Sequence, residues 1–96
     1  MNNVTDQVPV LIEKEIIPNL TFKNPIKIKQ QDDLMQRLSE ATTLGNIHHS
    51  KIAIIFYDDE GLKRVETTIW ATGAKYICLK GGVWLPISRI QEVRFV

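Results

Sequence analysis

The spacing of hydrophobic and polar residues changes along the chain and divides it into three parts. Residues 1–31 show no sustained period and carry three of the four prolines. Proline removes a backbone donor and favours an extended conformation in the residue before it. We therefore predict an extended, partly flexible N-terminal arm over 1–31, laid on the domain or on a neighbouring subunit. Residues 32–96 are predicted to form the folded domain.

From residue 32 the apolar residues recur with the period of an α-helix. The predicted buried face consists of Leu34, Met35, Leu38, Ala41 and Thr42. Asp32 is suited to the N-cap, Asp33 places negative charge at the positive end of the helix dipole, and Gly45 is suited to end the helix. The pattern thus predicts one α-helix in this part of the chain.

After residue 50 the pattern changes to β-branched and aromatic runs separated by turn residues. Five strands are predicted, at 51–57, 62–71, 75–80, 83–87 and 90–96. Short strands with tight connections must curl to hide their edges and enclose a core. We therefore expect an α+β fold, with one N-terminal helix followed by a five-stranded antiparallel small β-barrel.

Alternation along these strands assigns side chains to two faces. The residues predicted to face the core are Ile52, Ile54, Phe56, Val65, Ile69, Val83, Leu85 and Ile87. Tyr57, Trp70 and Trp84 are then directed outward, together with Ile55. Two interpretations stay open: the helix and the arm cover these aromatic rings, or the rings form a surface for protein recognition.

Composition and charge narrow the classes of partner. The chain is 44% apolar and 24% charged with a net charge of +1, which is typical of an ordinary globular domain. A nucleic-acid site would use Lys75, Lys80, Arg89 and Arg94 on phosphates, with Tyr76 or Trp84 stacking on bases. Acidic residues are interleaved with these cations, so nucleic acid is the alternative and a protein partner is the leading hypothesis.

Residue types that carry catalysis or bind metals are sparse. Cys78 is the single cysteine, and the adjacent His48 and His49 point in opposite directions in an extended segment. The three carboxylates at 58–60 precede Gly61, as in a solvated hairpin turn. We expect no catalytic residues, no metal and no cofactor, and hence no enzyme.

Targeting signals are not predicted either. The N-terminus has no basic region followed by an unbroken apolar run, and no stretch approaches the roughly 20 apolar residues of a membrane span. We expect a cytoplasmic protein that does not enter a membrane.

The segment GGVWLPISRIQEV resembles the closing segment of SH3-like small barrels, in which a helical turn separates the last two strands. The resemblance implies such a turn at residues 88–90. The preceding helix resembles the N-terminal helix of the Sm-like variant, although Lys80-Gly81-Gly82 is followed by two more strands here. The chain is also similar to small uncharacterised bacterial proteins that carry a TTIWA strand and an LKGG turn, a likeness that concerns the fold alone.

These observations favour a non-enzymatic protein-interaction or self-associating module, with a homo-oligomer as one form of it. A small-barrel protein that binds RNA or single-stranded DNA is the alternative. A third class, a small enzyme or ligand-binding barrel, depends on a pocket that sequence does not reveal.

Overall fold

The computed structural model describes residues 8–96. In this part of the chain there is one α-helix, α1 (Leu34–His48), with two 3-10 segments, η2 (Lys14–Asn19) and η3 (Ile87–Arg89). The strands are β1 (Val10–Leu11), β2 (Ile52–Tyr57), β3 (Leu62–Thr67), β4 (Ile69–Thr72), β5 (Tyr76–Leu79), β6 (Val83–Pro86) and β7 (Ile90–Phe95).

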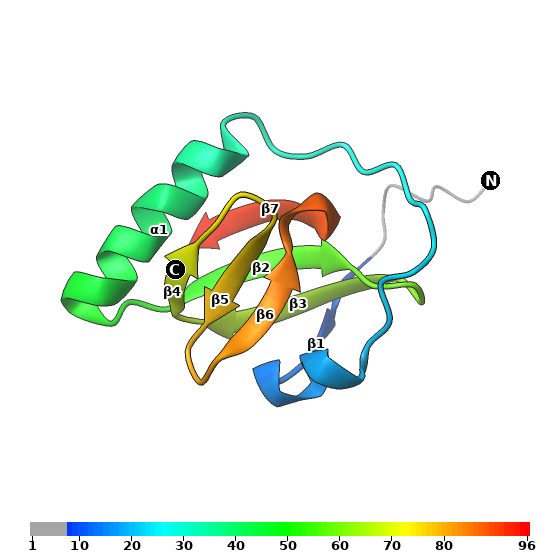
Figure 1. The fold of residues 1–96 in the computed structure, drawn as a ribbon, viewed down its shortest axis with the longest axis horizontal. Coiled ribbons are helices and arrows are strands. Elements are labelled where there is room, and N and C mark those ends of the chain that lie inside the picture. The colour runs from blue at the N-terminus through cyan, green and yellow to red at the C-terminus, as the bar shows by residue number, and fades with distance from the viewer. Residues whose placement is uncertain (1–7) are drawn as a thin grey trace.

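The strands form two sheets that face one another (Figure 1). One sheet has four strands in the order β1-β3-β2-β7, with β1 parallel to β3 and the other pairs antiparallel. The other has three antiparallel strands in the order β4-β5-β6. Residues 20–31, which we call the strap, run along one side of both sheets from η2 to the start of α1 (Figure 1).

The predicted five-stranded barrel is wrong. The predicted strand 62–71 divides at Thr68, where the chain passes from β3 in one sheet to β4 in the other. Thr68 is held at this crossing because its hydroxyl donates to the carbonyl of His49 and its own carbonyl accepts from Lys80 N. Among residues 8–96, β6 pairs only with β5 and β7 only with β2, so no ladder closes a barrel.

The helical turn implied at residues 88–90 is present one residue earlier, as η3, and it connects β6 to β7. The two sheets therefore meet at two crossings, Thr68 and η3, while their other edges stay apart. No helix in the described residues is long and apolar enough to cross a membrane.

The core lies between the sheets and is completed by α1 and η2. Ile52, Ile54 and Phe56 of β2 are buried, as their alternation predicts. Ile55, predicted on the opposite face, is also buried, because it lies between Arg64 and Glu92 of the neighbouring strands. Ile55 lies outside the core cluster, whose members besides Ile52, Ile54 and Phe56 are Ile17, Leu34, Leu38, Ala41, Val65, Ile69, Ile77, Leu79, Leu85, Ile87, Ile90 and Val93.

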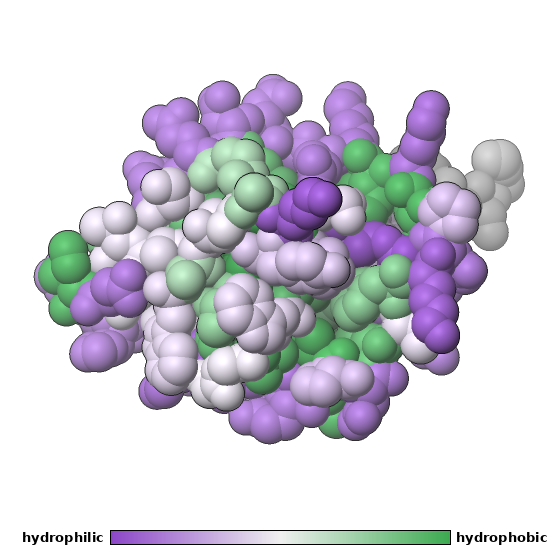
Figure 2. All heavy atoms as spheres, viewed as in Figure 1, coloured by the Kyte–Doolittle hydropathy of each residue, from purple (hydrophilic) through white to green (hydrophobic). Residues whose placement is uncertain are grey.

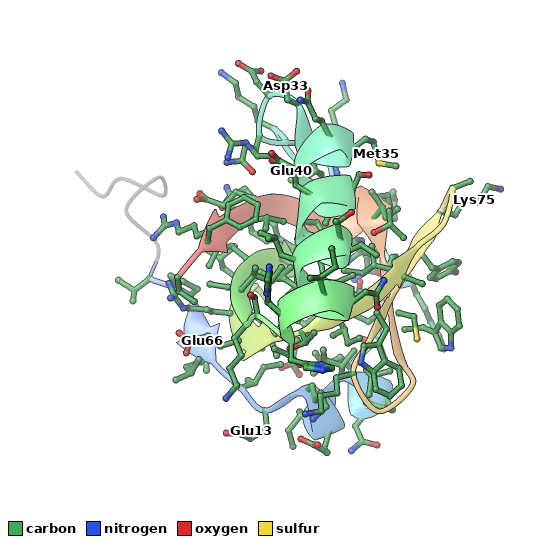
Figure 3. The ribbon with its side chains drawn as sticks, turned by 90° about the vertical axis from the view of Figure 1, so that its left-hand side faces the viewer. Glu13, Asp33, Met35, Glu40, Glu66 and Lys75 are labelled. Atoms are coloured by element: carbon green, nitrogen blue, oxygen red, sulfur yellow. The ribbon has the colours of Figure 1, made fainter. Side chains whose placement is uncertain are left out.

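Helix α1 differs from its prediction at both ends. Asp33, in a left-handed conformation, is the N-cap in place of Asp32, and the helix continues past Gly45 to His48. Met35 is half exposed and lies outside the buried face. The helix packs on β4 and β7, in front of the strands of both sheets in Figure 3.

Gly45 lies inside α1, where the helix backbone passes closest to β4. A Cβ atom at this position would be 2.5 Å from the carbonyl oxygen of Ile69 and 2.9 Å from Cγ2 of Thr68. The glycine therefore permits close helix-to-strand packing, in place of the predicted role as a helix terminator.

We expect Gly45→Ala to destabilise the protein by about 2 kcal/mol net. The methyl group would lie 2.5 Å from a backbone oxygen, so the overpacking cost is at the upper end of about 1–3 kcal/mol, and alanine regains up to about 1 kcal/mol in a helix interior. Urea unfolding would measure it, with the exposed Asn46→Ala as a matched control that should be neutral or slightly stabilising. Equal stability of wild type and Gly45→Ala would contradict the close approach.

Most sheet edges are covered by other segments. β1 pairs with the outer edge of β3. Gln31 covers β7, because its N–H donates to the Gln91 carbonyl at 2.8 Å and its side chain accepts from Val93 N at 3.0 Å. α1 lies along β4, where the hydroxyls of Thr42 and Thr72 are 2.7 Å apart. The outer edge of β6 pairs with no strand among residues 8–96.

Candidate functional site

The outer face of the β4-β5-β6 sheet carries three large aromatic side chains. Trp70, Tyr76 and Trp84 are 45%, 49% and 59% exposed. Cys78 lies between the two tryptophan positions, because it pairs with Trp84 on one side and Ala71 on the other. We call this surface the aromatic face. Pale atoms of intermediate hydropathy gather over β5 and β6 in Figure 2, which views it.

Only two of the three predicted interaction residues belong to this face. Trp70 and Trp84 are both on it, but Tyr57 lies on the four-stranded sheet, opposite Leu62, and is half buried. Helix α1 and residues 8–31 leave both tryptophans substantially exposed. The interpretation that the helix and the arm cover the aromatic rings therefore does not apply to Trp70 and Trp84.

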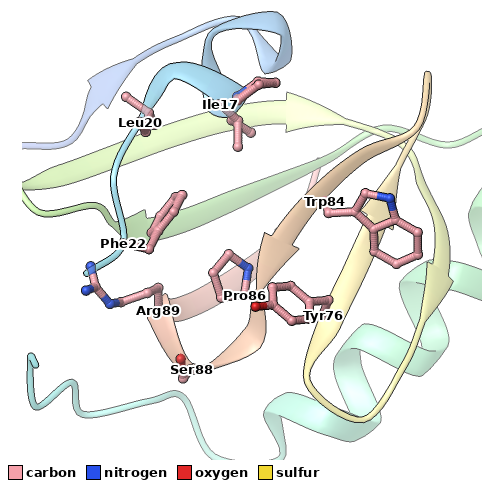
Figure 4. A pocket seen from close by; sticks show the side chains of 9 residues that line it. Ile17, Leu20, Phe22, Tyr76, Trp84, Pro86, Ser88 and Arg89 are labelled. Carbon is pink, nitrogen blue, oxygen red and sulfur yellow. The ribbon is translucent and has the colours of Figure 1, made fainter. Parts of the chain in front are cut away.

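A groove borders the aromatic face on the side of β6 away from β5 (Figure 4). Its volume is about 350 Å³. The lining residues are Ile17, Pro18, Leu20, Phe22, Tyr76, Trp84, Pro86, Ser88 and Arg89. We call it the edge groove. One wall is β6 and η3, and the other is η2 and the first residues of the strap, so segments far apart in sequence build it together.

Asp59 fixes the strap wall of the edge groove. Its carboxylate accepts from the backbone N–H groups of Lys23 at 2.9 Å and Asn24 at 3.1 Å, and from the Arg89 guanidinium at 2.9 Å. Arg89 also donates to the carbonyls of Asn24 and Tyr57 and lies 5.6 Å from the centre of the Phe22 ring. The groove wall is therefore tied to the β2-β3 turn through one charged pair.

Burial by itself would raise the pKa of Asp59. The hydrogen bonds from Lys23 N, Arg89 and Asn24 N outweigh it and lower the pKa to about 2. A carboxyl group with a lowered folded-state pKa stabilises the protein above its unfolded pKa of about 3.9, and that contribution is lost as the pH falls through the folded-state value.

We expect the free energy of unfolding to fall between about pH 5 and pH 2, and Asp59→Asn to remove part of this dependence. The amide side chain carries no charge to titrate, and the buried Arg89 loses its counter-charge, so the variant is also less stable at pH 7. Urea unfolding across the pH range measures both effects. An unchanged pH dependence in Asp59→Asn would show that the Arg89 pair does not hold the strap.

The neighbouring Asp58 is likewise structural. Its side chain is 1% exposed and accepts from the N–H groups of Glu60 and Gly61 and from Lys63 Nζ. Burial raises its pKa, but the hydrogen bonds from Lys63, Gly61 and Glu60 produce a net lowering. The prediction of a solvated turn is thus wrong for Asp58, whose carboxylate is used inside the turn.

The predicted phosphate-binding residues do not form one surface. Lys75 and Lys80 are exposed at opposite ends of β5, at the rim of the aromatic face. Arg89 is 5% exposed and bound to protein groups, whereas Arg94 lies on the other sheet and pairs with Glu92 at 2.6 Å. Tyr76 and Trp84, the predicted base-stacking residues, share the aromatic face, and the two lysines flank it at the ends of β5.

Metal and nucleophile candidates are dispersed. His48 ends α1 and His49 is its C-cap, while Cys78 is a half-buried free thiol. Within residues 8–96, no three His, Cys, Asp or Glu side chains are grouped to hold a metal ion.

Sequence reasoning did not find the strap wall of the edge groove. Ile17 is 2% exposed and Phe22 packs 6.2 Å from Phe56, both from a segment without a helical or strand period. Their only sequence signal is that residues 8–31 are too apolar for a solvated tail. The nucleic-acid alternative places Arg89 on phosphates, and nothing in the neighbouring sequence indicates that this side chain is buried.

Comparison of the chain with protein-family models, curated proteins and solved structures gave no match. The resemblance to SH3-like and Sm-like barrels therefore depends on the closing segment and the helix alone.

Proposed function

We propose that the protein is a non-enzymatic protein-interaction module and that the aromatic face is its binding surface. The observation that carries the proposal is the exposure of Trp70, Tyr76 and Trp84 on a single sheet face. Tryptophan and tyrosine are enriched among the residues that contribute most to binding in protein interfaces. Exposed aromatic side chains gathered on one face of a chain of 96 residues are typical of interaction sites, which supports the proposal.

The rigidity of the face supports this role. The aromatic rings project from paired strands, and the inward residues beneath them, Ile77, Leu79 and Leu85, are completely buried. Side chains held by a packed sheet lose little further freedom on binding, so more of the contact energy appears as affinity.

Catalysis has less support. Asp59 and Arg89, the charged pair at the edge groove, are both held by structural hydrogen bonds. A catalytic acid or base needs a group that is free to exchange a proton with substrate.

We expect Trp84→Ala to change the melting temperature by no more than about 2–4 °C, because exposed substitutions alter stability by about 0.5 kcal/mol or less. The same change should weaken self-association at high protein concentration at least about tenfold, since a tryptophan anchor is lost. Sedimentation equilibrium measures the association, and Ile47→Ala, an exposed apolar residue on α1, is the matched control.

Equal association of wild type and Trp84→Ala would overturn the aromatic face as a protein-binding surface. A large fall in melting temperature would instead show that Trp84 supports the fold.

Single-stranded nucleic acid is a second candidate, favoured by one observation. Tyr76 and Trp84 share a face, Lys75 and Lys80 flank β5 at its two ends, and the sequence has no aspartate or glutamate between Glu66 and Glu92. Exposed aromatic rings flanked by cations are typical of surfaces that stack bases and contact phosphates.

This second function predicts salt-dependent binding to oligo(dT) or oligo(U). With two phosphate-contacting lysines the slope of log K against log salt is about −1.4, and Lys75→Ala or Lys80→Ala each reduces its size by about 0.7. Fluorescence anisotropy measures these slopes. The protein-interaction proposal expects no binding even at about 50 mM salt.

A further inference from the structure

The outer edge of β6 presents backbone groups that no described strand uses. Ile87 N donates to the Lys75 carbonyl, which makes Tyr76 and Pro86 a non-hydrogen-bonded pair. In an antiparallel ladder the two kinds of pair alternate, so Leu85 directs its N–H and C=O toward β5. Trp84 therefore directs its N–H and C=O toward the open side, and Pro86 directs its C=O there.

Pro86 is consistent with this edge. A proline in a strand is tolerated where the missing N–H would point away from the sheet. The open edge thus offers one donor, from Trp84, and two acceptors, from Trp84 and Pro86. The edges of β3, β4 and β7 are covered by other parts of the chain. Within residues 8–96, the remaining edge strands are β1 and β6, and η2 packs beside β6 without a backbone hydrogen bond to it.

The edge groove lies directly along this open edge. Figure 4 shows Ile17, Leu20 and Phe22 on the strap side and Pro86 on β6, with β5 on the far side of β6. A strand added beside β6 would direct alternate side chains toward the apolar side of the groove, formed by Ile17, Leu20 and Phe22, and onto the aromatic face. β6 has four residues, which a partner segment of about 13 Å would match.

Charge indicates the kind of segment that fits. The groove is lined by no carboxylate, and Lys75 and Lys80 lie at the two ends of β5 without an ion-pair partner among the described residues. A strand beside β6 would lie about 10 Å from β5, within reach of lysine side chains, so acidic residues in it could pair with Lys75 and Lys80. A second copy of the β4-β5-β6 sheet would bring no carboxylate, because the sequence has none between Glu66 and Glu92. Charge complementarity therefore favours a different protein over a second copy at the β6 edge, whereas the uncharged rings of the aromatic face still allow weak self-association at high protein concentration.

We propose that the free edge of β6 binds an extended, acidic segment of a partner protein as a fourth strand of the β4-β5-β6 sheet, with an apolar side chain in the edge groove. This inference rests on the proposed protein-interaction function and specifies how the partner is held. Main-chain hydrogen bonds supply affinity in such strand addition, and the pockets for alternate side chains supply specificity.

The test uses random dodecapeptides displayed on phage and selected on the full-length chain. We expect the selected peptides to be acidic, with apolar residues at alternate positions. In the synthetic peptide, N-methylation of the residues whose N–H groups point toward β6 should weaken binding about tenfold. N-methylation of the alternate residues, whose N–H groups point away from β6, should weaken it less than about twofold. A scrambled peptide and the Ile47→Ala variant are the controls.

Hydrogen exchange gives a second readout. In the free protein the Trp84 amide should exchange rapidly while the Leu85 amide is protected, and bound peptide should slow exchange at Trp84 at least about tenfold. Both patterns together support the added strand.

Three results would overturn the inference. Equal tolerance of N-methylation in both parities would place the peptide on the aromatic face alone, so the proposed function would survive and strand addition would fail. Selection of no binding peptide would exclude this class of segment, leaving the Trp84→Ala association measurement to decide the function separately. A Trp84 amide already protected in a dimer would show that a second copy occupies the edge.

Discussion

The buried guanidinium of Arg89 is the interaction on which the binding region depends. A buried charge costs several kcal/mol unless hydrogen bonds and a counter-charge compensate it. Here the compensation comes from the carboxylate of Asp59 and the carbonyls of Tyr57 and Asn24, which belong to the β2-β3 turn, the end of β2 and the strap. Because all three groups bind the same guanidinium, the three segments are held together, and Phe22 is positioned beside that guanidinium.

The hydrogen bonds of Arg89 and Asp59 to the strap explain why a groove exists beside β6. The strap is fixed at Lys23 and Asn24, and Ile17 anchors η2 in the core, so the chain between these points follows β6 without pairing with it. At the opposite side Gly45 lets α1 approach β4 closely enough to cover that edge. The β4 edge of the three-stranded sheet is therefore covered by α1. The β6 edge faces the apolar residues of η2 and the strap across the edge groove, and the outward backbone groups of β6 lie beside this groove.

Part of this site was predictable. Strict alternation in VWLPI places Trp84 outward, and the structure leaves it 59% exposed. Alternation does not say which sheet a strand joins, so Tyr57 was grouped with Trp70 and Trp84 although it belongs to the other sheet. The burial of the η2 and strap residues that line the groove was not predictable, because an extended segment with prolines has no hydrophobic period that indicates which face is buried.

Local chemistry in the sequence determined the elements: the helix after residue 33, the β-strand character after residue 51, the helical turn near residue 88 and the inward set of β2. Each depends on neighbours a few residues away, through side-chain period and turn preference. Tertiary structure alone decided the rest. The break at Thr68, the burial of Arg89 and the open edge of β6 depend on contacts between residues distant in sequence, such as the 2.9 Å hydrogen bond from Lys80 N to the Thr68 carbonyl. A local pattern carries no information about such partners, which is why it predicts a barrel where residues 8–96 form two sheets and β6 pairs on one side alone.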